Sequence, residues 1–189
     1  MKAYVINLDD RPDRMIGFNK NEFPFEVTRF SAVKTENGTD GCNLSHFNLM
    51  REQTEFPFLI LEDDCVMVNP WSDVEKAISQ LPDDWDALWL GATLDAPLER
   101  YSDNLFRLNN AHVTHAIIWH NRKDGAVDYI LEHRNEINKI DDYFAKVIQP
   151  RFNCFVIYPM LCTQKQTKSD TCGRSDVSTI VNNYNRYCT

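Results

Sequence analysis

The chain has 189 residues and a formal net charge of −8, and 43% of its residues are hydrophobic and 25% charged. This composition is typical of a soluble globular protein, and the length predicts one domain that buries a normal core. The acidic charge argues against tight, nonspecific nucleic-acid binding, which depends on neutralising phosphates. No apolar run approaches the roughly 20 residues that span a bilayer. The N-terminus lacks the apolar region of a signal peptide, so we expect a cytoplasmic protein.

Predicted strands and helices alternate along the first half of the chain. The predicted strands cover 2–8, 25–33, 56–64 and 85–92, and the predicted helices cover 9–21, 42–55 and 71–82. Pro12 lies near the expected start of the first helix. Asn43 or Ser45 is the expected cap of the second helix, and Ser72 with Glu75 forms a capping-box pattern on the third. This alternation predicts an α/β fold with a mostly parallel, Rossmann-like sheet flanked by helices.

The second half is patterned less regularly. Strands are expected over 112–120 and 151–159, and helices over 123–136 and 140–149. A polar tail follows the last strand. None of the six cysteines has the C-x-x-C spacing of zinc or redox sites, so we expect reduced thiols.

Polar side chains follow the first and third predicted strands. Asn7, Arg11 and Arg14 come after the first, and three acids, 62–64, end the third. In open α/β sheets, ligands bind beyond the carboxyl ends of the strands. Arginines bind diphosphates through charge-assisted bonds, and carboxylates bind Mg²⁺ or Mn²⁺, which also accept phosphate oxygens. Together these residues predict a site for a metal and a nucleotide diphosphate.

Strand alternation divides the three acids. It places Glu62 and Asp64 on one face and Asp63 on the other. We therefore predict that Glu62 and Asp64 hold the metal and that Asp63 turns to a structural partner. The alternative is a solvated strand end whose acids precede the next helix. The chain has neither a P-loop nor a G-x-G-x-x-G motif, so metal and side chains would have to hold the phosphates.

Two further pairs are candidates for contacts with substrate. Ser45 and His46 are expected at a helix N-terminus, where they would contact an anion or a sugar hydroxyl; the alternative is a cap and a surface histidine. Asp141 and Asp142 are candidates for a general base. The alternative for them is an acid pair that complements a helix N-terminus.

The last candidates are Gln164 and Ser169, on a loop that could fold over a diphosphate, with an ordinary polar tail as the alternative. The histidines at positions 112, 115 and 120 straddle a predicted strand. Because alternation separates His115 from the other two, zinc is not expected there.

The motifs together resemble, in chain order, the blocks of glycosyltransferase family 25, which includes bacterial lipooligosaccharide and collagen galactosyltransferases. The blocks are "VINLDDRPDR", "RFSAV", "DGCNLSHFNLM", "FLILEDDCV", "THAIIW", "IDDYFAK" and "YPMLCTQKQTKSD". The resemblance runs from Tyr4 to about Asp170. Two stretches depart from it: the family's glycine-rich acidic block is reduced to "TDGC", and "THAIIWHNRKDGA" is a looser match.

The resemblance implies a GT-A-like nucleotide-sugar domain that transfers a sugar, usually galactose from UDP-galactose, with Mn²⁺. It assigns Asn7, Arg11 and Arg14 to the donor, Ser45 and His46 to the rim of the site, Glu62 and Asp64 to metal and donor, Asp141 to a later block, and Gln164 and Ser169 to the last block.

We therefore predict a single glycosyltransferase domain, with a donor-nucleotide half over 1–95 and an acceptor half with its polar tail over 96–189. It would move a hexose from a nucleotide sugar, with Mn²⁺ or Mg²⁺, to a hydroxyl acceptor such as a lipopolysaccharide-type glycan. Peripheral contact with a membrane is compatible with this prediction. Two alternatives stay open: a glycosyltransferase that modifies phage DNA bases, which the acidic charge disfavours, and a non-catalytic nucleotide-sugar-binding module.

Overall fold

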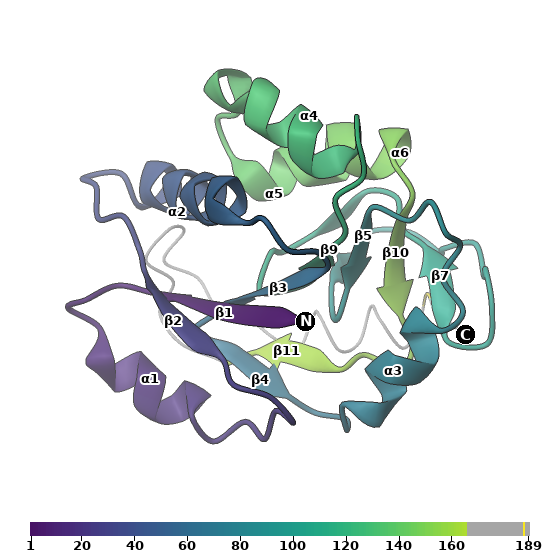
Figure 1. The fold of residues 1–189 in the computed structure, drawn as a ribbon, viewed down its shortest axis with the longest axis horizontal. Coiled ribbons are helices and arrows are strands. Elements are labelled where there is room, and N and C mark those ends of the chain that lie inside the picture. The colour runs from purple at the N-terminus through teal and green to yellow at the C-terminus, as the bar shows by residue number, and fades with distance from the viewer. Residues whose placement is uncertain (166–186, 188–189) are drawn as a thin grey trace.

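The structure is a computed structural model that describes residues 1–165 and Tyr187. Its centre is a seven-stranded sheet in the order β2-β1-β3-β9-β5-β10-β7 (Figure 1). These strands are β1 (Lys2–Asn7), β2 (Thr28–Ser31), β3 (Phe58–Glu62), β5 (Ala87–Trp89), β7 (Leu105–Arg107), β9 (Ala116–Trp119) and β10 (Cys154–Ile157). Two small antiparallel sheets accompany it: β4 (Cys65–Met67) with β11 (Cys162–Gln164), and β6 (Thr93–Leu94) with β8 (Ala111–His112).

Strand directions make the central sheet mixed. β1 pairs in parallel with β2 and β3, and β5 pairs in parallel with β10. β9 runs antiparallel between β3 and β5, and β7 runs antiparallel to β10. Five of the seven strands therefore point the same way. The predicted α/β fold is confirmed, with β9 and β7 as the reversed strands.

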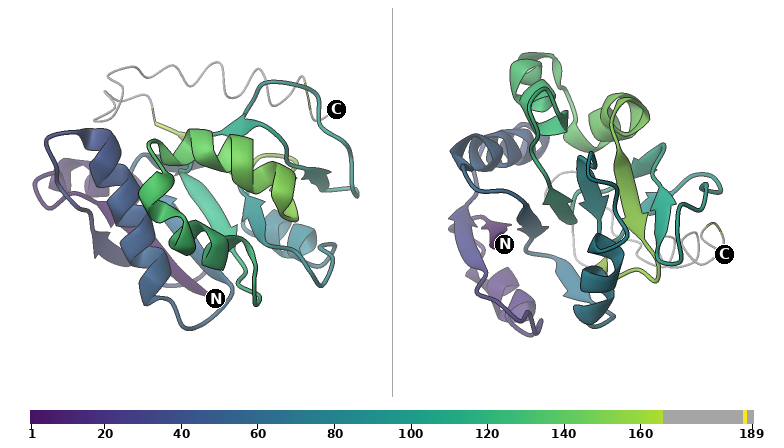
Figure 2. Two further views of the ribbon diagram at one scale, coloured as in Figure 1. Left: turned by 90° about the horizontal axis from the view of Figure 1, so that it is seen from above. Right: turned by 45° about the vertical axis from the view of Figure 1, so that its right-hand side comes forward.

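Helices cover both faces of the sheet (Figures 1 and 2). One face carries α2 (Gly38–Glu52), α4 (Ala126–Glu132) and the segment 140–151; the other carries α1 (Pro12–Phe18) and α3 (Ser72–Ile78). Each face has its own hydrophobic core. Along β3, Phe58 and Ile60 pack into the first core, and Leu59 and Leu61 pack into the second. Burial of both faces explains why this strand is a continuous apolar run.

The segment 140–151 is one helical run with a π-helical turn in the middle. It consists of α5 (Ile140–Tyr143), the π turn (Phe144–Ile148) and α6 (Gln149–Arg151), and a short 3-10 turn (Arg134–Glu136) precedes it. The predicted strand over 112–120 is interrupted by Val113, whose φ is 79°. Its second part, β9, begins at the end of β3, so Thr114 and His115 come to lie beside Glu62.

Two predicted helix starts are wrong. α2 begins at Gly38, and its cap is Asn37, whose side chain accepts a hydrogen bond from the Thr39 amide at 3.1 Å. Neither Asn43 nor Ser45 caps it, because both lie inside the helix and are buried.

In α3, Ser72 is the first helical residue, and the cap position holds Trp71 without a side-chain bond. The capping box predicted for Ser72 and Glu75 is therefore not formed. In the part of the chain that the structure describes, no helix is both long enough and apolar enough to cross a membrane.

Candidate functional site

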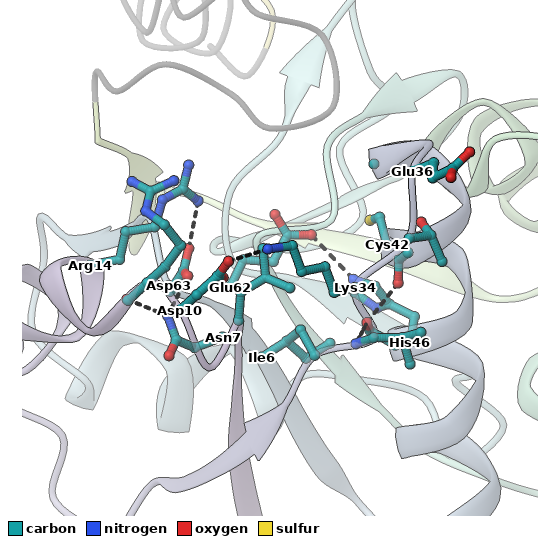
Figure 3. A pocket seen from close by; sticks show the side chains of 18 residues that line it. Ile6, Asn7, Asp10, Arg14, Lys34, Glu36, Cys42, His46, Glu62 and Asp63 are labelled. Carbon is teal, nitrogen blue, oxygen red and sulfur yellow. Dashed lines mark hydrogen bonds and ion pairs between the residues drawn. The ribbon is translucent and has the colours of Figure 1, made fainter.

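A cavity of about 380 Å³ opens at the carboxyl ends of β1, β2 and β3 (Figure 3). The floor includes Ile6 and Asn7 at the end of β1 and the acids Glu62 and Asp63 at the end of β3. The segment 32–36 after β2 and the inner side of α2 complete the wall. Parallel pairing produces this arrangement, since Ile6 lies beside Glu62 and Asn7 lies beside Ser31. The predicted meeting of the first and third strand ends is confirmed.

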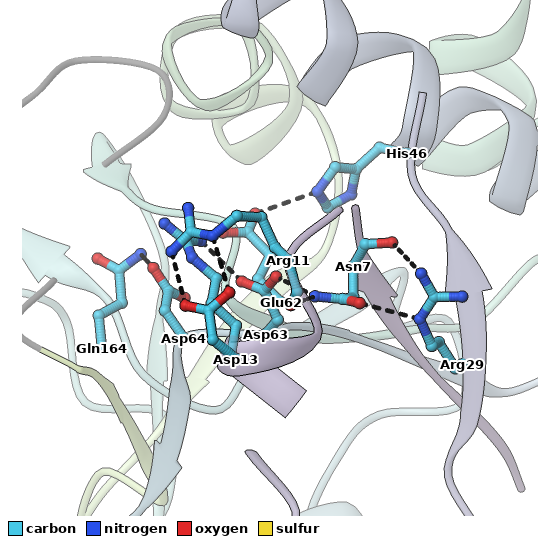
Figure 4. A network of polar contacts seen from close by, with 10 residues as sticks. Asn7, Arg11, Asp13, Arg29, His46, Glu62, Asp63, Asp64 and Gln164 are labelled. Carbon is cyan, nitrogen blue, oxygen red and sulfur yellow. Dashed lines mark hydrogen bonds and ion pairs between the residues drawn. The ribbon is translucent and has the colours of Figure 1, made fainter. Parts of the chain in front are cut away.

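Asp63 is held by two groups from the first strand and helix. Asn7 Nδ2 donates to one carboxylate oxygen at 2.7 Å, and Arg14 donates to the other at 2.8 Å. Asn7 is itself fixed by Arg29, which donates to its Oδ1 at 2.9 Å (Figure 4). Burial raises the pKa of Asp63, although the bonds from Arg14 and Asn7 oppose the shift. Asp63 thus has structural partners as predicted, and one of them is Arg14, which the resemblance assigned to the donor. The prediction that Asp63 points away from the site is wrong, because Asp63 lines the cavity and Asp64 does not.

Glu62 faces α2 and the start of β9. Thr114 Oγ1 donates to Glu62 Oε1 at 2.5 Å, and His46 Nε2 lies 3.2 Å from the same oxygen. Burial alone would raise the pKa of Glu62, but the hydrogen bonds from His46 and Thr114 and the charge of His46 outweigh it and lower that pKa. Glu62 is therefore an ionised carboxylate at the inner wall of the cavity.

Asp64 is the least satisfied of the three acids. Gln164 Nε2 approaches its Oδ2 at 3.4 Å, whereas Oδ1 is buried and has no hydrogen-bond partner among the described residues. Burial first, and then the charges of Glu62 and Asp63, raise the pKa of Asp64 to about 8. A buried carboxylate oxygen without a donor suits a cation ligand.

Gln164, from the last of the sequence blocks that resemble the family, lies close to the acids because of its position in β11. Gln164 ends this strand, which pairs with β4 directly after the acids, and the Lys165 amide donates to the Asp64 carbonyl at 2.6 Å. Gln164 therefore lies in a strand and contacts Asp64 (Figure 4). Ser169, predicted for the same loop, lies outside the described residues.

Ser45 and His46 do not lie at a helix N-terminus, because α2 begins seven residues before Ser45. Ser45 Oγ donates to the Gly41 carbonyl at 2.6 Å and accepts from the Val33 amide at 2.8 Å, so it fixes the cavity wall. His46 is 1% exposed and lies at the inner wall. Its Nδ1 is buried without a hydrogen-bond partner in the described part of the chain. The expected anion contact of a helix end is wrong for both residues.

Asp141 and Asp142 occupy the first turn of α5, as the helix-terminus alternative predicts. Lys139 lies 3.1 Å from Asp141 and 3.6 Å from Asp142, and His112 Nδ1 lies 3.5 Å from Asp142. Neither acid is among the described residues that line the cavity. The charge of Asp141 nevertheless acts on Cys42, whose pKa is raised by burial and then by Glu62 and Asp141. Asp141 therefore acts on Cys42 in the cavity wall, although neither acid lines the cavity.

Sequence reasoning missed Cys42, Lys34 and Thr114. Cys42 and Lys34 line the cavity, and Thr114 binds Glu62. The spacing of Cys42, four residues before His46, was the signal that could have placed the two on one helix face. Thr114 carried no local signal, because its role depends on the antiparallel insertion of β9 beside β3.

Arg11 also lines the cavity and donates to Asp13 at 3.0 Å. Seven of the side chains predicted for the site thus line one cavity: Asn7, Arg11, Arg14, Ser45, His46, Glu62 and Asp63. Asp64 lies next to this cavity, and Gln164 contacts Asp64. In comparisons with models of known protein families and with curated proteins, the sequence matches none of them.

Proposed function

We propose that the chain is a metal-dependent glycosyltransferase that moves a hexose from a nucleotide-sugar donor to a hydroxyl acceptor. One observation carries the proposal: Glu62 and Asp63 meet arginines and an apolar wall around a cavity of about 380 Å³ at the carboxyl ends of parallel strands, and the third acid, Asp64, lies next to this cavity. This volume lies within the range of roughly 300–1,000 Å³ of small-molecule sites. The resemblance to glycosyltransferase family 25 points to the same chemistry.

The cavity offers the two surfaces that a nucleotide diphosphate requires. Ile6, Ala32 and Val33 form an apolar part of its wall, suited to a base or ribose. Arg11 and Lys34 bring positive charge to the same cavity. Lys34 pairs with Asp10, and Arg11 pairs with Asp13. In the proposal these two exposed pairs open and their cations turn to the phosphates, because such pairs are held by only about 1 kcal/mol.

A divalent metal fits the acids at the floor of the cavity. Asp64 Oδ1 is buried without a donor among the described residues, and Glu62 is ionised beside it. We assign Mn²⁺ or Mg²⁺ to Glu62 and Asp64. When bound, such an ion stabilises the negative charge that develops on a leaving diphosphate. Asp63 is assigned a positioning role, since both its oxygens already accept bonds from Asn7 and Arg14.

The proposed reaction inverts the sugar. The acceptor hydroxyl oxygen forms a bond to the anomeric carbon, the bond from that carbon to the diphosphate oxygen breaks, and the nucleoside diphosphate leaves. The hydroxyl proton passes to a carboxylate. Asp141 or Asp142 is proposed for this role; because neither lines the cavity, the proposal requires the acceptor hydroxyl to lie between these acids and the donor. Lys139 forms ion pairs with both acids, at 3.1 Å from Asp141 and 3.6 Å from Asp142. A lipopolysaccharide-type glycan is the acceptor class that the family resemblance favours.

A donor screen tests the proposal. UDP-, GDP-, CMP- and TDP-sugars are incubated with the protein, with Mn²⁺ or with a chelator, and the release of nucleotide is followed. We expect one donor class to be hydrolysed only with metal. If no nucleotide sugar is bound or turned over, the proposal is refuted. Binding of a donor without turnover, with a range of hydroxyl acceptors present, would instead identify a binding module.

Two variants locate the site. Glu62→Gln and Asp64→Asn keep the side-chain volumes and remove a proposed metal ligand, so we expect donor hydrolysis to fall about 100-fold, the scale of losing one group that stabilises developing charge. Glu75→Gln, on exposed α3, is the matched control and should keep full activity. Unchanged activity in both site variants would remove the metal assignment.

A further inference from the structure

Cys42, His46 and Glu62 form a cluster of a thiol, an imidazole and a carboxylate at the inner wall of the cavity (Figure 3). One potential ligand atom from each residue lies within 4.8 Å of the other two. Cys42 and His46 are four residues apart, so they share the face of α2 that lines the cavity. Glu62 reaches them from the end of β3. Two elements that pack independently of any ligand therefore hold the three side chains together.

The groups in this cluster are incompletely satisfied without a cation. His46 is 1% exposed, its Nε2 faces Glu62, and its Nδ1 has no hydrogen-bond partner among the described residues. The Glu62 carboxylate belongs to the cluster, and a second acid, Asp63, lines the same cavity. This surrounding charge favours a cation over a neutral ligand.

The ligand types decide which cation fits. We propose that Cys42, His46 and Glu62 form a Zn²⁺ site. Thiolate and imidazole select Zn²⁺ over Mg²⁺ or Mn²⁺, which prefer oxygen ligands. Three protein ligands at a cavity wall leave a fourth position open to the solvent-filled space, as in catalytic zinc sites. Thr114 donates to Glu62 and orients it, the usual role of groups behind metal ligands.

The site is distinct from the Mn²⁺ or Mg²⁺ assignment in its ligands and its metal, although it shares Glu62. Zn²⁺ bound here would occupy that carboxylate and oppose binding of the harder ion to Glu62 and Asp64. Its existence does not depend on glycosyl transfer, because the test below uses only protein and metal.

Cobalt spectroscopy tests the thiolate ligand directly. The protein is stripped of metal with a chelator, passed into chelator-free buffer and titrated with Co²⁺, which replaces Zn²⁺ in such sites and reports a bound thiolate by an intense sulfur-to-cobalt absorption in the near ultraviolet. We expect this absorption to saturate at one equivalent and to disappear when Zn²⁺ is added. Absence of Co²⁺ binding, or binding without the sulfur absorption, would overturn the proposal.

Matched cysteine variants identify the sulfur. Cys42→Ser should abolish the absorption and weaken Zn²⁺ binding by about tenfold or more, given that losing a group behind the ligands alone costs about 10–100-fold. Cys154→Ser is the control, because this buried thiol begins β10 at the opposite edge of the sheet. An absorption that survives in Cys42→Ser would assign the sulfur to another cysteine and reject the site.

Thiol labelling of the unmodified protein gives an answer even if Cys42→Ser does not fold. The chain is treated with a thiol reagent with and without Zn²⁺, and labelled peptides are mapped by mass spectrometry. We expect Zn²⁺ to slow the labelling of Cys42 and to leave the labelling of Cys154 unchanged. Equal labelling of Cys42 in both conditions would contradict the proposal.

Discussion

Carboxylates are buried at both the amino and the carboxyl ends of the parallel strands, here called the two edges of the sheet. The hydrogen bonds that these carboxylates accept differ between the two edges. At the amino edge of β5, Asp86 is fully buried and accepts from the Ala126 amide at 3.0 Å, the Asn153 amide at 2.9 Å and Arg122 at 3.0 Å. Gly125 permits this approach, because a Cβ there would lie 2.9 Å from Asp86 Oδ1. At the carboxyl edge of β3, Asp64 has one buried oxygen without any donor among the described residues.

This difference separates the structural acid Asp86 from Asp64, for which we propose a role as a metal ligand. Asp86 joins β5, β10 and the start of α4, and each of its oxygens receives a hydrogen bond from within the fold. Asp64 is repelled by Glu62 and Asp63, Gln164 donates to its Oδ2 at 3.4 Å, and its buried Oδ1 has no hydrogen-bond partner among the described residues. A fold keeps a buried charge that lacks donors only at a cost. The unsatisfied oxygen of Asp64 is therefore consistent with the cation that we propose at the carboxyl ends of these strands.

Removing the acid at the structural edge should have the largest effect. Asp86→Ala leaves the Ala126 and Asn153 amides without their acceptor, and we expect it to lower the free energy of unfolding by about 3 kcal/mol, since each unsatisfied buried donor costs about 1–3 kcal/mol. Urea denaturation measures the change. Asp83→Ala, on the exposed turn before β5, is the control and should stay within about 0.5 kcal/mol of the unmodified protein. If Asp86→Ala and Asp83→Ala change the free energy of unfolding equally, Asp86 is not a structural acid and the proposed difference between the two edges is rejected.

At the carboxyl edge, replacing the buried acid should increase the free energy of unfolding instead of lowering it. In chelated, metal-free protein we expect Asp64→Asn to raise the free energy of unfolding by about 1–2 kcal/mol, because it removes a buried acid whose ionised form is opposed by burial and by the charges of Glu62 and Asp63. The unfolded chain ionises this acid above its usual pKa of 3.8 and the folded chain only above about 8. Between these values the folded state binds more protons, so its stability falls as pH rises. The advantage of the variant should therefore grow from pH 4 to pH 8.

Parallel urea titrations of the two proteins across this pH range test the reversal. A second series with Mn²⁺ should stabilise the unmodified protein more than the variant, because a ligand stabilises the folded state that binds it. If Asp64→Asn is less stable than the unmodified protein in metal-free buffer, Asp64 is a structural acid like Asp86.

The sequence predicted most of the fold, because the elements that it predicted are those with strong local patterns. The apolar run that ends at Glu62 became β3, and Pro12 became the first residue of α1. The reversed direction of β9 was not predictable, since strand pairing depends on contacts far apart in the chain. The start of α2 was misplaced because "KTENGTDG" consists of turn residues, which also serve as helix caps.

The sequence predicted which strand ends form the site. It did not predict which side chains there form hydrogen bonds with one another. Residues at strand ends were placed correctly, since topology alone brings Asn7 and Asp63 together. The engagement of Arg14 by Asp63 depends on how α1 packs under the sheet, which no pattern in the sequence encodes. Ser45 and His46 were misjudged for the same reason as the helix start: an error of four residues moved both from the interior of α2 to its end.

The start of α2 provides the prediction with the smallest expected effect. It compares how the helices at the two edges have their first amides capped. Near Asp86, α4 begins at Ala126, its N-cap Gly125 makes no side-chain hydrogen bond, and Asp86 accepts from the Ala126 amide. At the carboxyl edge, α2 is capped locally by the exposed Asn37. Asn37→Ala should therefore lower the free energy of unfolding by only about 1 kcal/mol, the usual value of one cap. Asn37→Ser keeps a capping oxygen and should fall within a few tenths of a kcal/mol of the unmodified protein. Thermal and urea unfolding compare the three proteins. If Ala and Ser are equivalent at this position, the cap contributes nothing, and α2 is held over the cavity by the packing of its buried face alone.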